Sequence, residues 1–294
     1  NALLGDYGFF LGVDDTFDSN ISINIIHLDM LEREADVSHN YNVIKIDPGL
    51  KVNITEHYVS GNDGSGLNNM FTHVLVGSGA ELDLSKLQTQ GAGSNHVAST
   101  YVHQAGKSTV NLGFYNFGAR NSHSTVKCWL EGAGAKCNIV CLALINERRQ
   151  HDMNAKVYHQ APNCCSNQVI RALSDDKAII SINAGIFVAE GACGTVADLQ
   201  NKNLLLSQRA VINTQPDLEI YNDDVMCTHG ATVGALDDDM IFYLRSRGMS
   251  LAQAKRVLLS AFVNSLLDYV KIVPFKSLIQ ASLLGVLNLS EFEV

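Results

Sequence analysis

The densest group of residues that could do chemistry lies between Pro216 and Gly248. If Val225–His229 is an extended strand, Cys227 and His229 point to the same face of it, because side chains alternate along a strand. A thiolate and an imidazole placed side by side are competent ligands for iron or zinc. Two ligands do not complete a metal site. From spacing alone the pair is therefore either part of such a site or a buried thiol beside a hydrogen-bonded histidine.

The other cysteines give weaker candidates. The chain has seven cysteines and no CxxC pair, which indicates reduced thiols in a core rather than a disulfide framework or a zinc site of common spacing. Cys164 and Cys165 lie near His159, but adjacent residues of a strand face opposite ways. Cys137 and Cys141 would share one strand face. We expect structural roles for all four. We expect three histidines of the same region at turns or on the surface: His96, His103 and His123.

The charge balance argues against two classes of partner. Lysine plus arginine is 21 and aspartate plus glutamate 30, which gives a formal net charge of −9. Nucleic-acid and anionic-membrane surfaces usually need a basic patch, so we expect neither partner. No uninterrupted apolar run approaches the roughly 20 residues of a membrane helix. The segment AGKST at 105–109 lacks the glycine spacing of a P-loop, so we expect no ATPase activity from this chain.

Short β-rich segments separated by small turn residues make up most of the chain before residue 232. The clearest are Thr72–Val76, Thr100–His103, Thr109–Phe114, Thr125–Leu130, Asn138–Leu144, Ala178–Ile182 and Ile186–Val188. Successive turn residues are 27, 28, 28 and 29 positions apart: Gly79, Gly106, Gly134, Pro162 and Gly191. Self-similarity at such a period is typical of a solenoid, and for strands this means a β-helix. A β-sandwich with regular turns is the competing interpretation.

The pattern becomes helical after residue 232. Asp237–Asp239 fits the N-terminus of one helix and Gly248 its C-terminal cap, while Ser250 fits the N-cap of a second helix. A third helix is expected over residues 275–287. The apolar face predicted for the second helix consists of Leu251, Ala254, Leu258, Phe262, Leu266 and Tyr269. These patterns predict a mainly β protein with a β-helix core at 1–232 and a small helical domain at 233–294. The segment 1–45 has no clear boundary.

Two segments resemble the SufB/SufD family of iron–sulfur cluster assembly scaffold proteins. They are CTHGATVGALDDDMIFYLRSRGMSLAQAKRVLLSAF at 227–262 and NKNLLLSQRAVINTQPDLEIYNDDV at 201–225. The HGAT form and the following YLRSRG are closer to the SufD branch. The resemblance implies a right-handed parallel β-helix followed by a small C-terminal α-helical domain, acting as a scaffold rather than an enzyme.

The resemblance also implies partners and site residues. The β-helix would pair with a SufB-like subunit, with His229 and Cys227 at the cluster-assembly interface and as tentative metal ligands. A SufC-like ABC ATPase would dock on the helices at about Asp237–Asp268, with contacts from Phe242, Leu244, Arg245 and Arg247. The alternatives are that Phe242 and Leu244 are core residues and that Arg245 and Arg247 form structural ion pairs. The family implies a cytoplasmic protein, or a plastid one in a plastid-bearing eukaryote, with no stably bound cofactor and a transient iron–sulfur cluster in the complex.

Two departures from the family pattern leave other functions open. The segment GACGTVADLQ at 191–200 keeps only Ala197, Asp198 and Gln200 in the family register, and the usual N-terminal helical domain is missing from the sequence given. We therefore expect a truncated or a divergent short homologue. One alternative is a structural β-helix that forms homodimers without assembly activity. A less favoured one is a carbohydrate-active β-helix enzyme, which would need paired carboxylates facing a groove.

Overall fold

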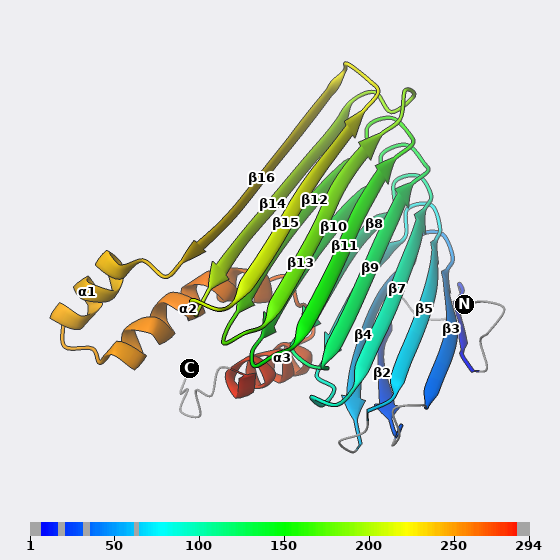
Figure 1. Cartoon of the computed structure of the whole chain (residues 1–294). Helices are drawn as coiled ribbons and strands as arrows, with labels where there is room; N and C mark the ends of the chain where they lie inside the picture. Colours follow the sequence, from blue (N-terminus) through cyan, green and yellow to red (C-terminus); the bar gives the residue numbers. More distant parts are fainter. Residues whose placement is uncertain (1–6, 17–20, 32–35, 62–64, 287–294) are drawn as a thin grey trace.

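Parallel strands wind into a two-sheeted β-solenoid in the computed structural model, which describes residues 7–16, 21–31, 36–61 and 65–286 (Figure 1). The strands in these ranges are β1 (Phe10–Val13), β2 (Ile21–Asp29), β3 (Val37–Ile46), β4 (Lys51–Ser60), β5 (Leu67–Val76), β6 (Glu81–Gln88), β7 (Asn95–Gln104), β8 (Thr109–Asn116), β9 (Asn121–Leu130), β10 (Lys136–Ile145), β11 (Gln150–His159), β12 (Cys165–Ser174), β13 (Ile179–Val188), β14 (Thr195–Leu205), β15 (Val211–Ile220) and β16 (Val225–Ala235).

Strand order distinguishes this fold from a β-sandwich. The odd-numbered strands form one sheet in the order β1-β3-β5-β7-β9-β11-β13-β15, which we call the first sheet. The even-numbered strands from β2 to β16 form the second sheet. Every strand is parallel to its neighbours, and the chain alternates between the sheets, so each turn of the solenoid contributes one strand to each. The predicted solenoid and its turn period are confirmed.

A residue with a left-handed backbone conformation recurs at the turns that lead into the second sheet. Gly79 and Gly134, both predicted turn residues, adopt a left-handed conformation two positions before β6 and β10. At the equivalent positions before β8 and β12 the left-handed residues are Lys107 and Asn163, and before β14 it is Gly194. The other predicted turn residues, Gly106, Pro162 and Gly191, also lie in turns, but a different residue of each turn takes the left-handed conformation. Glycine adopts this conformation without the cost that a Cβ atom imposes.

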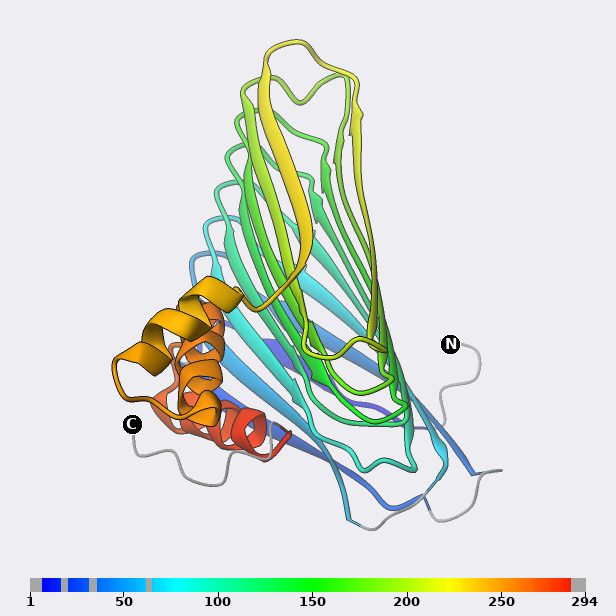
Figure 2. The ribbon, with the colours of Figure 1, turned by 60° about the vertical axis from the view of Figure 1, so that its left-hand side comes forward.

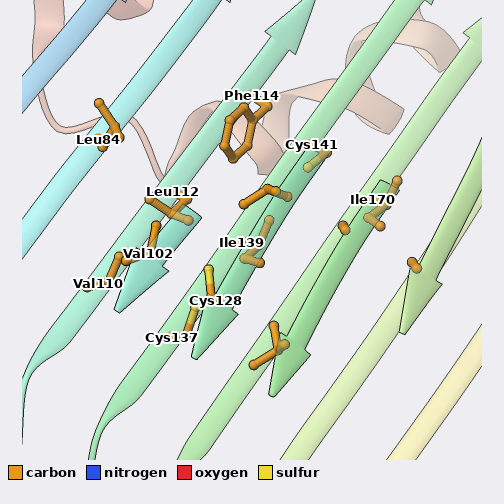
Figure 3. Close-up of a cluster of buried hydrophobic side chains, with 14 of the residues drawn as sticks. Leu84, Val102, Val110, Leu112, Phe114, Cys128, Cys137, Ile139, Cys141 and Ile170 are labelled. Carbon is orange, nitrogen blue, oxygen red and sulfur yellow. The ribbon is translucent and has the colours of Figure 1, made fainter. Parts of the chain in front are cut away.

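The main hydrophobic core fills the space between the two sheets. Figure 3 shows Leu112, Ile139 and Ile170 of successive second-sheet strands among its members. Cys128 and Cys141 lie in the same cluster, and burial raises the pKa of both thiols well above the ordinary value. These cysteines are therefore protonated packing residues, as the sequence predicted.

A second core lies on the outer face of the second sheet, beneath the helices (Figure 2). Strand β10 has the unbroken apolar run IVCLALI because Ile139, Cys141 and Ala143 face the inner core while Val140, Leu142 and Leu144 face the helices. A strand covered on both faces loses the usual polar alternation. The helices are therefore packed onto the solenoid rather than appended beyond it.

Three helices follow the last strand: α1 (Asp238–Ser246), α2 (Leu251–Leu267) and α3 (Val273–Val286). The predicted caps are confirmed, with Asp237 as the N-cap of α1, a left-handed Gly248 after it, and a capping box at Ser250. Helix α3 begins two residues before the predicted start and takes Pro274 into its first turn, where a missing N–H costs nothing. In the described ranges no helix is long and apolar enough to span a membrane.

The predicted apolar face of α2 is partly wrong. Leu251 and Tyr269 are exposed, whereas Leu259, Val263 and Leu267 are buried against the sheet. Arg171 on the outer face of β12 donates to the Phe262 carbonyl and to Ser265 Oγ, and its guanidinium lies 4.9 Å from the Phe262 ring centroid. Phe262 is therefore half-buried at the rim of the contact, while Leu259, Val263 and Leu267 pack against the sheet.

One further expectation about strands is corrected. The segments Ala178–Ile182 and Ile186–Val188 belong to one strand, β13, because both flanking strands pair along its whole length. In the segment 1–45, the described residues form β1, β2 and most of β3, which pair with later strands of the solenoid.

Part of the solenoid interior is polar. Glu56 is fully buried, with Lys86 Nζ 3.1 Å from its Oε1 and His27 Nε2 3.2 Å from its Oε2, while the Tyr58 hydroxyl donates to the same carboxylate. Burial alone would raise the pKa of Glu56, but the Lys86 charge and these hydrogen bonds hold it at about 2. His96 is also buried here, which corrects its predicted surface position.

Acid should destabilise the fold through its buried histidines. Burial lowers the pKa of His151 to about 4, from an ordinary value of 6.5. As the pH falls below 6.5, the unfolded chain binds a proton that the folded chain does not, so the stability present above pH 6.5 is lost progressively toward pH 4. Between pH 7 and pH 4.5, we predict that the unfolding free energy of His151→Met falls by about 2 kcal/mol less than that of the wild type. Urea unfolding at both pH values measures the two differences.

The control for this prediction is His229→Met, which replaces an exposed histidine of β16, far from His151. It should leave the difference in unfolding free energy between the two pH values unchanged. Equal pH dependence in His151→Met and the wild type would contradict the assigned role of His151.

Candidate functional site

Cys227 and His229 lie on β16, the last strand of the second sheet. They pair with Ala197 and Leu199 of β14, both of which belong to the inner core. Residues in register on parallel strands face the same way. Both side chains therefore point to the interior side of the solenoid at its open end, on one face of the strand as the sequence predicted.

The two residues differ in exposure. Cys227 is half-buried against the core, and burial raises the pKa of its thiol above the ordinary value. His229 is exposed and has no hydrogen bond, ion pair or ring contact to any residue in the described part of the chain. Cys227 is thus a protonated thiol at neutral pH, and His229 is an imidazole that is free to meet another molecule.

Asp198 holds β16 on the opposite, outer face of the sheet. Its carboxylate accepts hydrogen bonds from the Thr228 hydroxyl and from Gln200 Nε2, the second at 2.9 Å. Thr228 lies between Cys227 and His229, so this bond fixes the strand segment that presents them. The sequence contained a signal for this role of Asp198, because Asp198 and Gln200 are two of the three family positions kept in the segment 191–200.

The donor set on this chain is incomplete for a metal. Across the described ranges, no group of three or more His, Cys, Asp or Glu side chains is arranged to hold an ion. Zinc and iron sites commonly need four donors. Cys227 and His229 can therefore supply two ligands at most, and any further ligands must come from another molecule or from the cargo itself.

The end of the solenoid that carries these residues is an open edge. Strands β15 and β16 are each last in their sheet, so each pairs on one side within the described structure. Unpaired backbone groups of an edge strand are a template for another chain. Large apolar side chains are exposed around this edge: Val196, Val211, Ile220, Tyr221, Met226 and Val233.

Helix α1 projects beyond the solenoid and packs against α2 (Figure 1). Only Ile241 of this helix is buried, and Phe242 is 74% exposed, so the alternative of a core position for Phe242 is wrong. Leu244 is half-buried. Arg245 and Arg247 are exposed, and no ion pair in the described ranges joins either to Asp237–Asp239. The Arg247 guanidinium lies 5.3 Å from the Tyr243 ring centroid.

The weaker candidates do not form a site. His159 Nε2 lies 2.8 Å from Ser166 Oγ in the interior, whereas the Cys164 thiol donates to carbonyls of the turn, 3.4 Å from the oxygen of Gly132. Cys165 is half-buried at the start of β12. These residues have structural positions, as predicted.

The fold is an open-ended parallel β-solenoid with helices packed on one sheet, and the Cys227 thiol and the His229 imidazole lie together on its last strand. Residues 30–262 match the family described as SUF system FeS cluster assembly, SufBD core domain. The chain belongs to this SufB/SufD family.

Curated relatives agree with this assignment. The iron–sulfur cluster assembly protein SufD of Escherichia coli is 33% identical over 80% of this chain and 56% of its own length. An iron–sulfur cluster assembly SufBD family protein of Synechocystis is 31% identical over 69% of this chain and 45% of its own. Protein ABCI7, chloroplastic, of Arabidopsis thaliana is 28% identical over 82% and 51%. The chain thus spans about half the length of these relatives.

The fold should not depend on His229. We predict that His229→Ala changes the unfolding free energy by less than about 0.5 kcal/mol, because the side chain is exposed and makes no contact. Cys227→Ala should cost roughly 1 kcal/mol, because its sulfur packs on the end of the core. Thermal and urea unfolding of both variants measure this. A loss above 2 kcal/mol in His229→Ala would reveal a structural role.

Proposed function

We propose that this chain is a SufD-like scaffold subunit of the SUF iron–sulfur cluster assembly machinery. It pairs with a SufB-like subunit through the open end of the solenoid and docks a SufC-like ABC ATPase through its C-terminal helices. The single observation that carries the proposal is the position of Cys227 and His229, the pair singled out by family resemblance, on an edge strand that is paired on one side only in the described structure.

The open end supports pairing with another solenoid. A solenoid buries its core by stacking turns, and its terminal turns need a cap or a partner. Here Met226, near the start of β16, is 69% exposed, and Val233 near its end and Tyr221 beyond the end of β15 are exposed as well. A SufB-like solenoid would cover this apolar edge. A second copy of the chain, as in the homodimer alternative, would use the same surface.

Cluster chemistry at this end would need both subunits. Cys227 and His229 give one thiol and one imidazole, and a partner seated on the edge would bring further donors within reach of them. The cluster is cargo in this scheme, bound transiently during assembly, and no resident cofactor is required. The chain would supply ligands or an interface rather than catalysis of its own, with ATP hydrolysis provided by the SufC-like partner.

Helix α1 supports a second docking surface. Phe242 and Arg245 are exposed on α1 and Arg247 is exposed at its C-cap, whereas the fully buried residue of the helix is Ile241, so a partner can contact all three without displacing core residues. Exposed aromatic and arginine side chains are enriched among residues that carry binding energy at interfaces. Leu244 would lie at the rim of this contact. We place the assembly in the cytoplasm, or in the plastid if the source has one, by analogy with the family.

Co-purification tests the scaffold proposal. The chain, co-expressed with SufB-like and SufC-like proteins of the same source, should elute with both at a fixed stoichiometry. His229→Ala should still fold and join the complex but should reduce cluster formation at least tenfold, by the loss of a ligand or contact at the reacting centre. Cluster formation is followed by absorbance in the visible range and by activity of an iron–sulfur enzyme in cells.

His123→Ala is the matched control, since it removes an exposed histidine far along the first sheet. Normal cluster formation in His229→Ala would remove that residue from the site. Elution of the chain as a homodimer, with neither partner retained, would favour the structural alternative.

A charge reversal tests the helical surface. Arg245→Glu with Arg247→Glu should weaken binding of the SufC-like ATPase roughly tenfold or more, because exposed interface charges on one helix would change sign. The affinity is measured by titration of the purified ATPase. Lys136→Glu with Lys202→Glu makes the same change of charge on exposed strand positions and should leave the affinity unaltered. If the arginine variant binds the ATPase as tightly as the wild type does, then Arg245 and Arg247 serve the fold and do not contact the partner.

A further inference from the structure

A groove of about 1030 Å³ lies along the edge where second-sheet strands turn into first-sheet strands. It is formed by the turns 117–120, 146–149, 175–178 and 206–210, which connect β8 to β9, β10 to β11, β12 to β13 and β14 to β15. These segments are about 30 residues apart in sequence and adjacent only because the turns stack. The groove is separate from the end that carries Cys227 and His229.

Each of these turns contributes a cation to the groove. Arg120, Arg148, Lys177 and Arg209 all line it, all are exposed, and none has an ion-pair partner in the described part of the chain. Neighbouring parallel strands lie about 4.8 Å apart, so the four side chains originate within roughly 15 Å of one another. Four unpaired cations so close together repel one another, which a bound anion would relieve.

The carboxylates in the groove are already engaged. Asp176 Oδ2 accepts the backbone N–H of Glu147 at 3.1 Å, and Glu147 Oε2 lies 3.5 Å from Arg149 Nε. Five basic and two acidic side chains line the groove, which gives it a formal charge of +3 within a chain of −9. Positive charge concentrated in a groove creates a local field that attracts anions, even though the chain as a whole is negative.

We propose that this groove binds a small molecule bearing a pyrophosphate group. Three of the four unpaired cations are arginines, whose planar guanidinium groups bind phosphate oxygens in bidentate geometry. Gln150 and Gln208 add uncharged donors to the lining. The volume of the groove is that of a small-molecule site rather than of a flat protein interface. This inference does not depend on the proposed scaffold function.

Isothermal titration of the full chain with inorganic pyrophosphate and with ADP tests the proposal. We expect one site with a Kd on the order of 10–100 μM at low ionic strength, weakening as salt is raised. Arg120→Glu with Arg209→Glu should weaken binding of both ligands by roughly tenfold or more. The double variant should fold normally, because neither side chain has a partner in the described structure, and its melting temperature checks this.

Lys136→Glu is the control, since it reverses an exposed charge at the opposite edge, where β10 begins. Equal affinity for pyrophosphate and ADP would assign the site to the pyrophosphate group alone, and tighter ADP binding would assign it to a nucleotide. Three outcomes would overturn the proposal. They are no binding of either ligand, equal weakening in Lys136→Glu and the double variant, or binding of a polyglutamate peptide that pyrophosphate does not displace.

Discussion

Parallel pairing of each strand with the turns before and after it is the constraint on which the structure depends. In the interior of the solenoid, every strand has both edges satisfied, as β12 does between β10 and β14. In the described residues, the last turn does not meet this condition, because β15 and β16 each pair on one side only. Pro216 in β15 fits such a position, because proline lacks an N–H and is tolerated in edge strands. Cys227 and His229 therefore lie on a strand that has one unpaired edge in the described structure.

The same stacking gives the two sheets different outer faces. The outer face of the second sheet is covered by α2 and α3 at its central strands, with Arg171 joining α2 to β12. The first sheet instead carries an aromatic ladder in which Trp129 stacks on Tyr158 with ring centroids 5.3 Å apart, flanked by Tyr101 and Phe187. Such contacts add to the pairing of strands already in register. The helices are thus confined to one side of the molecule, and α1 projects beyond it.

The sequence predicts features that repeat locally and misses those that depend on stacking. The turn period and the shared face of Cys227 and His229 follow from strand alternation, and the helix caps follow from Asp237 and Ser250. The burial of His96 could not be foreseen, because a polar residue in an alternating strand is normally assigned to the outer face. The cationic groove depends on residues such as Arg120 and Arg209, 89 positions apart, which only the assembled solenoid brings together.

Burial and metal binding act in opposite directions on Cys227. Burial already raises the pKa of its thiol, and a partner that covered the edge would raise it further and keep the sulfur protonated. Iron reverses this preference, because a coordinated thiol gives up its proton. In the proposed complex, a covered site therefore favours a thiolate only when the cluster is present. By linkage, the cluster would then strengthen the pairing of subunits by the same factor as pairing strengthens its binding. In the proposed complex, two donors on an open edge would suit this coupling, since Cys227 and His229 could supply only part of the ligands of a cluster.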